Sequence, residues 1–282
     1  MSVEAVLLGI AQDGGVPQAG CDCANCSRAW GDPDSRQYVA CLGLVDRANG
    51  RSWLIDATPD FREQLGTLHS LAPECRLAGI ALTHAHIGHY VGLVHLGREV
   101  MGARDVPVYA TPRLIGFLGD NAPWSQLVAL RNIELRSLSP ATEIQLGPDL
   151  HLTPLTVPHR GEFSDTVAFV VRGSARRLFY CPDVDAWDLW EHDLRSFVAG
   201  MDIALLDATF FSVGELPGRD VGEIPHPLVT DTVGRLIGVD CDVRLIHLNH
   251  TNPLLAPGPE RNWLAAAGIR VGAFGDRWTL GK

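Results

Sequence analysis

The stretch that decides the fold of this chain is Leu82-Thr83-His84-Ala85-His86-Ile87-Gly88-His89-Tyr90, at the end of an apolar run over residues 77–82. His84 and His86 lie two positions apart, so in an extended chain their rings point to the same side. His89 follows one tight turn later and can return to the same point. Imidazole nitrogens are good ligands for borderline metal ions. The stretch therefore predicts a metal site at the end of a strand, in preference to core histidines bonded to backbone.

The composition indicates a globular protein with a sizeable core. Of the 282 residues, 46% are hydrophobic and 20% are charged, and no disordered tract stands out. This length allows one large domain or two fused halves. The 23 basic and 33 acidic residues give a formal net charge of −10, which repels polyanions. The chain is therefore not expected to bind nucleic acid.

The first residues do not resemble a targeting segment. Residues 1–5 contain no basic region followed by a long apolar one, and no window is apolar and long enough to cross a bilayer. We therefore expect a cytoplasmic protein without membrane partners. The expected partner is a small-molecule or small-peptide substrate, and a homodimer is the commonest assembly to expect.

Three of the seven cysteines crowd into the segment Cys21-Asp22-Cys23-Ala24-Asn25-Cys26. Without an export signal, this Cys-x-Cys-x-x-Cys spacing indicates thiolate metal ligands more than disulfides. A tetrahedral structural zinc site would need a fourth ligand from elsewhere in the chain. The alternative is three free buried thiols. The remaining cysteines stand singly and are expected to be small buried hydrophobic residues.

The rest of the chain alternates between strand and helix patterns. Two β-type runs within residues 39–55 predict a hairpin, and apolar residues at helical spacing predict helices over 60–69 and 91–101. Helical character is also expected at 184–197. Two comparable halves, each with strands and then helices, favour two sheets packed face to face with helices outside. We therefore predict a layered α/β fold, an αββα sandwich in a single domain that covers residues 1–282.

Polar residues that metals favour recur directly after apolar, strand-like runs. His159 follows the run 152–158, Asp183 comes after 178–182, and His247 follows Val243-Arg244-Leu245-Ile246. Each residue alone is weak support, because a lone histidine beyond a strand is more often structural. Together with the histidine cluster they gain weight, since a metal site needs several ligands from separate strands.

The order of these motifs, a His-x-His-x-x-His cluster followed by His, Asp and His, resembles the metallo-β-lactamase fold superfamily. The resemblance implies an αββα sandwich with metals at one edge of the sheets. It implies a bridging carboxylate and two sets of ligands: His84, His86 and His159 for a first metal, Asp183 as the bridge, and His89 and His247 for a second metal. A bridging carboxylate reduces the repulsion between two cations.

The chain departs from this family at Gly88, where the usual cluster has an aspartate that binds the second metal. Loss of an anionic oxygen ligand should weaken the second site and shift its preference toward softer or nitrogen-liking metals. A single working metal, or iron in place of zinc, is therefore possible. Asp60 or a water molecule are the alternatives for filling the gap.

Further stretches narrow the resemblance to two branches of the superfamily. The loop around Val16-Pro17-Gln18 and the segment Cys21–Cys26 resemble both the PQQ-biosynthesis protein B family and the cyclic-phosphate phosphodiesterases of phosphonate degradation. Other stretches resemble the first branch and extend over nearly the whole chain: 52–54, 58–60, 218–222 and 246–253. The complete histidine cluster is closer to the hydrolases.

The resemblance also suggests roles for residues outside the histidine cluster. It implies a structural zinc site at Cys21, Cys23 and Cys26, with His250 as fourth ligand, because the phosphodiesterases have a zinc-binding histidine there; His226 is the alternative.

His226 itself resembles the histidine that donates a proton in the phosphodiesterases, a role that contributes on the order of 10²-fold or more. The alternative is an exposed loop histidine between two prolines. Asp56 and Asp207 stand at the ends of predicted strands and are expected to orient metal ligands through hydrogen bonds. The pocket is expected to be lined by Asp13, Tyr90, Arg160 and Asp185.

Three functions remain open from the sequence. In the first, a metal-dependent hydrolase, a metal-bound hydroxide attacks a phosphodiester, ester, lactone or amide, with zinc or manganese at the histidines and with Asp183 and His226 as the catalytic residues. In the second, iron at the histidines activates dioxygen to hydroxylate a substrate during maturation of a peptide-derived cofactor or natural product. The third is a non-catalytic binding protein that metal stabilises.

Overall fold

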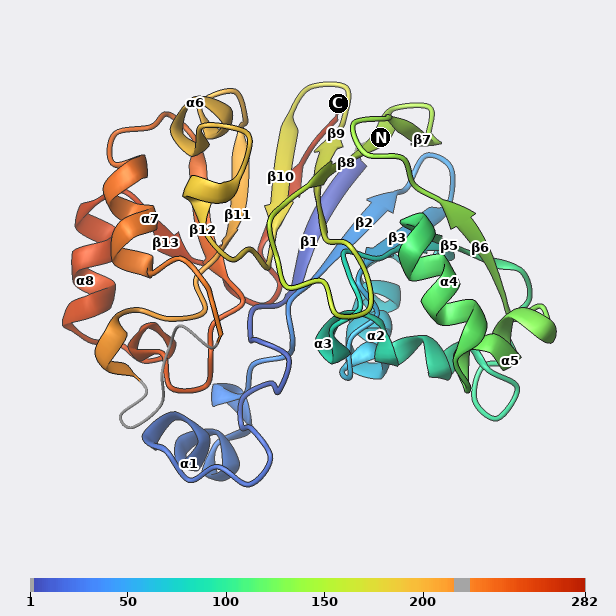
Figure 1. Cartoon of the computed structure of the whole chain (residues 1–282), viewed down its shortest axis with the longest axis horizontal. Helices are drawn as coiled ribbons and strands as arrows, with labels where there is room; N and C mark the ends of the chain where they lie inside the picture. The colour runs from blue at the N-terminus through green and yellow to red at the C-terminus, as the bar shows by residue number, and fades with distance from the viewer. Residues whose placement is uncertain (1–2, 216–223, 282) are drawn as a thin grey trace.

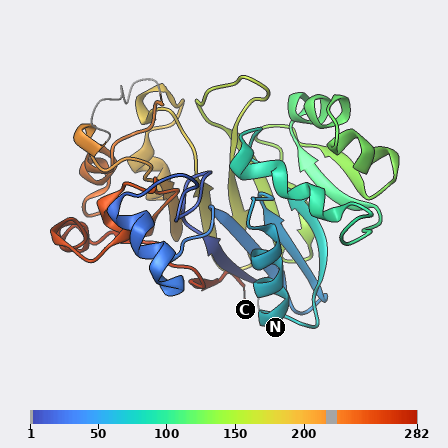
Figure 2. The same ribbon diagram turned by 90° about the horizontal axis from the view of Figure 1, so that it is seen from below.

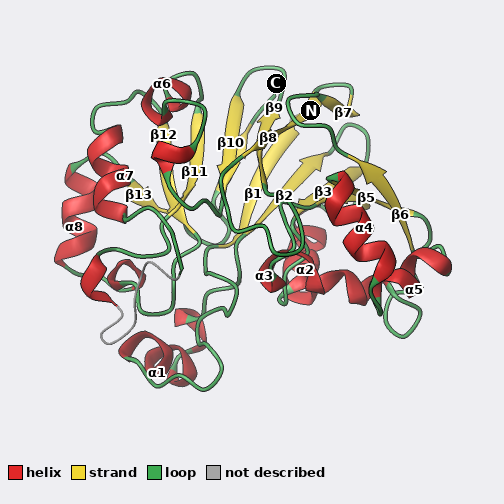
Figure 3. Ribbon diagram, viewed as in Figure 1, coloured by secondary structure: helices red, strands yellow, loops and turns green. Residues whose placement is uncertain are grey.

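The structure is a computed structural model, which describes residues 3–215 and 224–281. Two mixed β-sheets stand side by side in the centre, and helices cover the outer face of each (Figure 1 and Figure 3). This is the αββα sandwich that the sequence predicts. The stretch 218–222, part of the resemblance to the PQQ-biosynthesis branch, lies outside the described residues.

The first sheet has seven strands in the described part of the chain, and three helices pack on its outer face. In spatial order the strands are β14 (Arg277–Thr279), β1 (Val3–Gly9), β2 (Cys41–Asp46), β3 (Arg51–Ile55), β4 (Arg76–Ala81), β5 (Val106–Ala110) and β6 (Ile133–Ser137). The helices are α2 (Phe61–Leu71), α4 (Pro112–Asp120) and α5 (Trp124–Ala129). The hairpin predicted within 39–55 is formed by β2 and β3, and the helix predicted at 60–69 is α2.

The second sheet also has seven strands among the described residues and mirrors the first. In spatial order they are β13 (Arg270–Val271), β12 (Asp242–Ile246), β11 (Ile203–Asp207), β10 (Arg177–Cys181), β9 (Val167–Arg172), β8 (Leu150–Thr156) and β7 (Ile144–Gly147). Its outer side carries α6 (Leu194–Val198), α7 (Val229–Leu236) and α8 (Pro259–Ala266), on the left of Figure 1.

Strand β1 illustrates how the sequence fills both sides of its sheet. Successive side chains of a strand point to opposite faces. Ala5 and Leu7 therefore belong to the core between the two sheets, whereas Val6 and Leu8 belong to the core under the outer helices. Burial on both faces explains the continuous apolar run in a strand of this kind.

The parallel strands at the centre of each sheet determine where functional side chains gather. Strands β3 and β4 are parallel, and so are β10, β11 and β12. In sheets of this type, the residues that follow the carboxyl ends of parallel strands meet at one rim. The candidate residues Asp56, Asp183 and His247 follow β3, β10 and β12 in this way.

Two predicted helices are shorter than expected. The prediction of a helix over 91–101 is wrong, because α3 (Ile87–Tyr90) ends before this range and only a 3₁₀ turn over Val91–Leu96 forms within it. Glycine is a poor helix former, and the turn ends where Gly97 donates its N–H to the carbonyl of Val94, three residues back.

The helical character expected at 184–197 is also only partly present. A 3₁₀ turn, Trp187–Leu189, and the short helix α6 form instead. Asp193 caps α6 by accepting the N–H of Ser196, so the chain starts a new helix there. The apolar pattern in this region reflects burial of tryptophans more than helical period: Trp190 is buried, and its Nε1 donates to the carbonyl of Thr156.

No helix in the described ranges combines the length and apolar character that a membrane crossing requires.

Candidate metal centre

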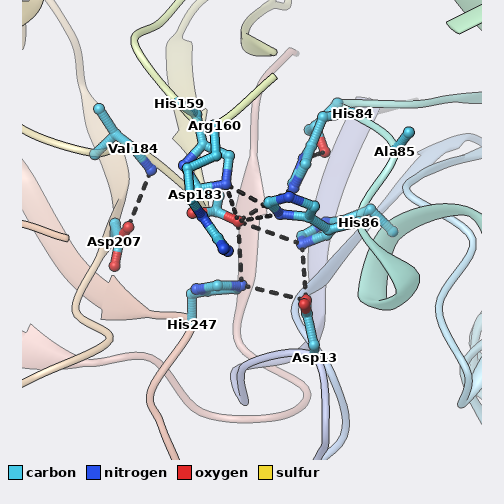
Figure 4. Close-up of polar contacts among 12 residues, drawn as sticks. Asp13, His84, Ala85, His86, His159, Arg160, Asp183, Val184, Asp207 and His247 are labelled. Atoms are coloured by element: carbon cyan, nitrogen blue, oxygen red, sulfur yellow. Dashed lines mark hydrogen bonds and ion pairs between the residues drawn. The ribbon is translucent and has the colours of Figure 1, made fainter. Parts of the chain in front are cut away.

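Six side chains predicted to bind metal converge at the rim of the sandwich, and Figure 4 shows most of them pointing toward one another. They come from the segments that follow four strands: His84, His86 and, in α3, His89 after β4, His159 after β8, Asp183 after β10, and His247 after β12. Donor atoms of His84, His86, His159 and Asp183 all lie within 4.8 Å of one another. These are the first-metal ligands and the bridge that the resemblance implies.

Asp183 lies at the middle of this group. Its Oδ2 is 3.2 Å from Nε2 of His84 and 3.2 Å from Nε2 of His159. The same oxygen is 4.0 Å from Nε2 of His89 and 3.9 Å from Nε2 of His247. One carboxylate thus faces both predicted sets of histidines, which is the position that a bridging ligand requires.

Several donor atoms at the centre are buried without a hydrogen-bond partner among the described residues. They are Nε2 of His84, His89 and His247, Oδ1 of Asp183 and Oδ1 of Asp13. An unsatisfied buried polar atom costs roughly 1–3 kcal/mol, so several of them turned toward one region need an explanation. Imidazole and carboxylate donors are those that zinc, iron and manganese accept. The residues present therefore fit a metal site.

The outer nitrogens of His84 and His89 are held, directly or through Thr83, by a carboxylate at the end of β3. Asp56 accepts hydrogen bonds from the backbone N–H of Thr83 at 2.8 Å and from its hydroxyl at 2.9 Å. Nδ1 of His84 lies 3.0 Å from that hydroxyl, and Nδ1 of His89 lies 2.8 Å from Oδ2 of Asp56. A hydroxyl that gives its one proton to Asp56 can only accept from His84. The proton of His84 is therefore on Nδ1, and Nε2 is free to bind a metal.

The same pattern occurs at the end of β11. Asp207 accepts from the backbone N–H and the hydroxyl of Thr209, both at 2.8 Å, and Nδ1 of His247 lies 2.9 Å from that hydroxyl. Asp207 also accepts the N–H of Val184 at 3.0 Å, a bond drawn in Figure 4. Asp207 thus fixes the chain next to Asp183 as well as the tautomer of His247.

His159 and His86 are held from outside in a similar way. Nδ1 of His159 lies 2.7 Å from Oδ1 of Asp185, and Nε2 of His86 lies 3.2 Å from Oε2 of Glu162. Their other nitrogens, Nε2 and Nδ1 respectively, face Asp183. Each of these histidines therefore has one anchored nitrogen and one nitrogen that points to the centre.

The charges at the centre are balanced between carboxylate and imidazole. Burial would raise the pKa of Asp183, but the facing His159 and His247 hold that pKa well below its ordinary value. Burial lowers the pKa of His159, yet Asp183 raises it to about 9. Burial holds the pKa of His84 well below its ordinary value. His84 is therefore neutral, the form that binds a metal.

His226, the predicted proton donor, lies beside the centre. It is buried, and its Nδ1 is 2.7 Å from Oδ2 of Asp207 and 3.5 Å from Oδ1 of Asp183. Burial lowers the pKa of His226, but Asp207 and Asp183 raise it above the ordinary value. The structure therefore excludes an exposed loop position for this side chain and places it next to Asp183, the predicted bridge.

The other candidate pocket residues divide into two groups. Asp13 lies inside the centre, with Oδ1 3.3 Å from Nε2 of His89, and Asp185 contacts His159 as described. Tyr90 instead packs against Trp124, with ring centroids 4.8 Å apart. Arg160 lies 3.7 Å from the carboxylate of Glu162.

Asp60, an alternative for the missing carboxylate beside Gly88, is used elsewhere. Its Oδ2 accepts the backbone N–H of Val39 at 2.8 Å, and it belongs to none of the donor groups at the centre. That alternative is wrong, because this hydrogen bond ties the side chain to the backbone at Val39, just before β2.

Sequence reasoning missed the two threonines and Glu162. Thr83 directly precedes His84, and this adjacency is the only signal that the sequence offered for it. Thr209 and Glu162 lie far along the chain from the histidines that they contact. Their roles depend on the fold and leave no local pattern.

The cysteine segment forms a second donor group, made of three thiols and one imidazole. Cys21, Cys23, Cys26 and His250 have donor atoms within 4.8 Å of one another, and Nδ1 of His250 is 3.3 Å from Sγ of Cys21. The segment leads into α1 (Ala24–Gly31), which Figure 2 shows beside the C-terminal part of the chain. His250, and not His226, therefore stands where a fourth ligand is needed.

Comparison with known proteins agrees with this fold. Residues 51–265 match the model of the Beta-lactamase superfamily domain. Coenzyme PQQ synthesis protein B from Methylorubrum populi is 29% identical, covering 95% of this chain and 97% of the relative, and the protein of that name from Methylobacterium nodulans is 30% identical, covering 97% and 98%.

Two solved structures share the fold over almost their full length. Zinc-bound PqqB from Methylobacterium extorquens superposes with a TM-score of 0.82 at 24% identity, covering 98% of this chain and 100% of the other. A new diphosphatase from the PhnP family gives a TM-score of 0.71 at 25% identity, covering 99% and 97%. By its sequence, its sandwich and its rim of histidines, the chain belongs to the Beta-lactamase superfamily and, within it, is similar to coenzyme PQQ synthesis protein B.

Proposed function

We propose that this chain is a metal-dependent hydrolase whose preferred target is a phosphodiester or a phosphoric anhydride. The observation that carries the proposal is the set of buried nitrogen and oxygen atoms that face one another at the rim without hydrogen-bond partners in the described part of the chain. The likeness to a diphosphatase of the PhnP family supports the choice of phosphorus–oxygen bonds.

The donor groups define which residues would hold metal. His84, His86, His159 and Asp183 would hold one ion, and Asp183 with His89 and His247 would hold part of a second site. Zinc is the metal that the likeness to zinc-bound PqqB favours, and iron and manganese accept the same donors. When bound, such ions lower the pKa of water and polarise the oxygens of the substrate.

The chain's own residues provide orientation and a proton. Asp56 and Asp207, through Thr83 and Thr209, keep Nε2 of the histidines free of protons and pointed at the centre. His226 carries a proton beside Asp183, held by Asp207. We assign to His226 the protonation of the leaving oxygen, which is expected to contribute on the order of 10²-fold.

A cavity next to the centre gives a place for a small-molecule substrate. It has a volume of about 410 Å³, and among the described residues Asp13 is the one member of the donor groups at the centre that lines it. Arg36 and Arg62 line the same cavity and offer positive charge for a phosphate group.

The test is hydrolysis of a phosphodiester and of a nucleoside diphosphate by protein loaded with zinc or manganese. His159→Ala should lose at least 100-fold in turnover together with metal content, whereas the control His69→Ala, on the exposed side of α2, should keep both. His226→Gln should keep its metal and lose about 10²-fold in kcat. Full turnover in His159→Ala would contradict the proposal.

A second candidate function is supported by the 29–30% identity to coenzyme PQQ synthesis protein B. In that case iron would occupy the histidines, and the reaction would be an oxidation that consumes dioxygen. Elemental analysis of protein purified without added metal separates the candidates. Iron with oxygen consumption favours the hydroxylase, and zinc or manganese with hydrolysis favours the hydrolase. Metal at the cysteines alone favours a binding protein without catalysis.

A further inference from the structure

Gly88 lies against a loop that carries a carboxylate. A Cβ atom at position 88 would stand 2.1 Å from Oδ1 of Asp13 and 2.8 Å from its Cα. Both distances are far below any tolerated contact, and the second involves backbone, so a change of rotamer at Asp13 could not relieve it. A side chain at position 88 and Asp13 in its present place therefore exclude each other.

The loop after β1 holds Asp13 firmly in this place. The N–H of Gln12 donates to the carbonyl of Leu248 at 2.9 Å, which ties the loop to the segment that carries His247. On the other side, the N–H of Gly15 donates to the carbonyl of Gln12 at 2.8 Å, and Gly15 has a φ of +66°, which glycine adopts without strain. Asp13 thus sits in a closed turn that is anchored beside the metal centre.

The carboxylate of Asp13 faces two inward-pointing histidines. Its Oδ1 is 3.3 Å from Nε2 of His89 and 3.8 Å from Nε2 of His247. None of these three atoms has a hydrogen-bond partner among residues 3–215 and 224–281, and all three are shut off from solvent. Figure 4 shows Asp13 and His247 directed at each other across the centre. Burial would raise the pKa of Asp13, but His247 and His89 hold it well below its ordinary value, so it is a carboxylate.

We propose that Asp13 is the anionic oxygen ligand of the second metal site, completing a donor set with His89, His247 and the shared Asp183, and that Gly88 is glycine because it makes room for this ligand. The carboxylate comes from the loop after β1 instead of from the histidine cluster itself. The inference rests on the metal centre of the proposed function but not on hydrolysis.

This assignment changes the expectation that Gly88 weakens the second site. The site keeps one anionic oxygen and two imidazole donors, with Asp183 shared. Its preference for zinc-like or manganese-like ions is therefore not reduced by the missing side chain at position 88.

The test is the metal stoichiometry of four proteins, measured by elemental analysis and by competition with a chromophoric chelator, with a melting curve to establish folding. Wild type should bind two ions at the histidines besides one at the cysteines. Asp13→Ala should bind one fewer and lose on the order of 100-fold in affinity for it. The matched control Asp60→Asn, on the wall of the same cavity, should behave as wild type. Gly88→Ala, whose Cβ cannot stand beside Asp13 in its present place, should likewise bind one ion fewer.

The outcomes separate this inference from the proposed function. If Asp13→Ala is folded and keeps every ion at unchanged affinity, the ligand assignment is wrong, even when the wild type hydrolyses its substrate. If Asp13→Ala loses one ion while no protein shows hydrolysis, the assignment stands and the proposed function fails. A folded Gly88→Ala that keeps every ion overturns the claim that Gly88 makes room for the ligand.

Discussion

The two halves of the metal centre have the same hydrogen-bond pattern, but the residues that form it are spaced differently along the chain. In the half formed by β3 and β4, Asp56 holds Thr83 and, through it, His84, and also binds His89 directly. In the half formed by β11 and β12, Asp207 holds Thr209 and, through it, His247, and also binds His226 directly. Thr83 and His84 are neighbours in sequence, whereas Thr209 and His247 are 38 residues apart. The two halves therefore both hold Nδ1 of a histidine so that Nε2 points to the centre, but they do so without a common sequence motif.

Backbone strain marks both halves. Asp56 and His247 are two of the non-glycine residues with positive φ, at 71° and 60°. Such conformations cost on the order of 1 kcal/mol or more and persist where the surroundings impose them. Both residues directly follow central parallel strands, where the chain must turn at once to aim a side chain at the rim.

The halves differ in the carboxylates that surround the histidine bound directly by Asp56 or Asp207, which is His89 in one half and His226 in the other. Nε2 of His89 faces both Asp13 and Asp183. Nδ1 of His226 contacts Asp207 and, of the two carboxylates that His89 faces, lies near Asp183. Under the proposed function, both histidines that Asp56 anchors, His84 and His89, would bind metal. Of the two that Asp207 anchors, His247 would bind metal and His226 would transfer a proton.

The largest expected effect comes from removing the anchoring carboxylates. Asp207→Ala would leave the N–H groups of Val184 and Thr209 and the imidazole of His226 without their acceptor, at a cost of roughly 3–5 kcal/mol in unfolding free energy. It should also disturb Asp183 and so reduce the content of both metals.

Asp56→Ala should cost a similar free energy but lose less metal, because Asp56 orients His84 and His89 without holding the chain next to Asp183, the carboxylate between the two predicted sites. Urea unfolding and metal analysis of both variants check this difference. Equal metal loss in the two variants would show that the halves are not distinct in this respect.

A smaller effect is expected from the threonines that connect carboxylate and histidine. Thr83→Val and Thr209→Val keep the side-chain shape but remove the hydroxyl that fixes Nδ1 as the protonated nitrogen of His84 and His247. Metal affinity should fall about 10–100-fold in each, with little change in the other half. Chelator competition measures the affinity, and Thr→Ser at the same positions should restore it. Affinity that stays at the wild-type value in Thr209→Val would mean that the tautomer of His247 is fixed by other contacts.

This comparison also explains how much of the centre the sequence could predict. The β3–β4 half could be predicted from the sequence because His84, His86 and His89 lie close together after one strand. His159, Asp183 and His247 were recognisable only through their positions after apolar runs and through the family resemblance. Asp13 carried no local signal of ligation, since its role depends on Gly88 meeting a loop more than 70 residues earlier in the chain.

The fold was predictable for a related reason. Apolar periodicity determines which segments become strands and which face they bury, and two similar halves imply two sheets. The helices expected at 91–101 and 184–197 did not form over their full ranges, because their apolar residues pack around turns. In these turns tertiary contacts determine the conformation more than the helical spacing of apolar residues does. Long-range hydrogen bonds such as that of Trp190 to Thr156 leave no trace in local sequence.

The smallest expected effect concerns the outer partners that differ in exposure. Glu162, with 48% of its side chain exposed, holds His86, whereas Asp185, with 18% exposed, holds His159. An exposed charge is screened by water and salt, so its hydrogen bond contributes little. Glu162→Gln should change metal affinity less than 10-fold, and Asp185→Asn should change it more, toward the upper part of the 10–100-fold range. Chelator competition at low and high salt measures both, and the effect of Glu162→Gln should shrink further at high salt. If Glu162→Gln lowered metal affinity more than Asp185→Asn, burial would not determine how strongly each carboxylate supports its histidine. His86 would then depend on the segment that carries Glu162 more than on the sandwich.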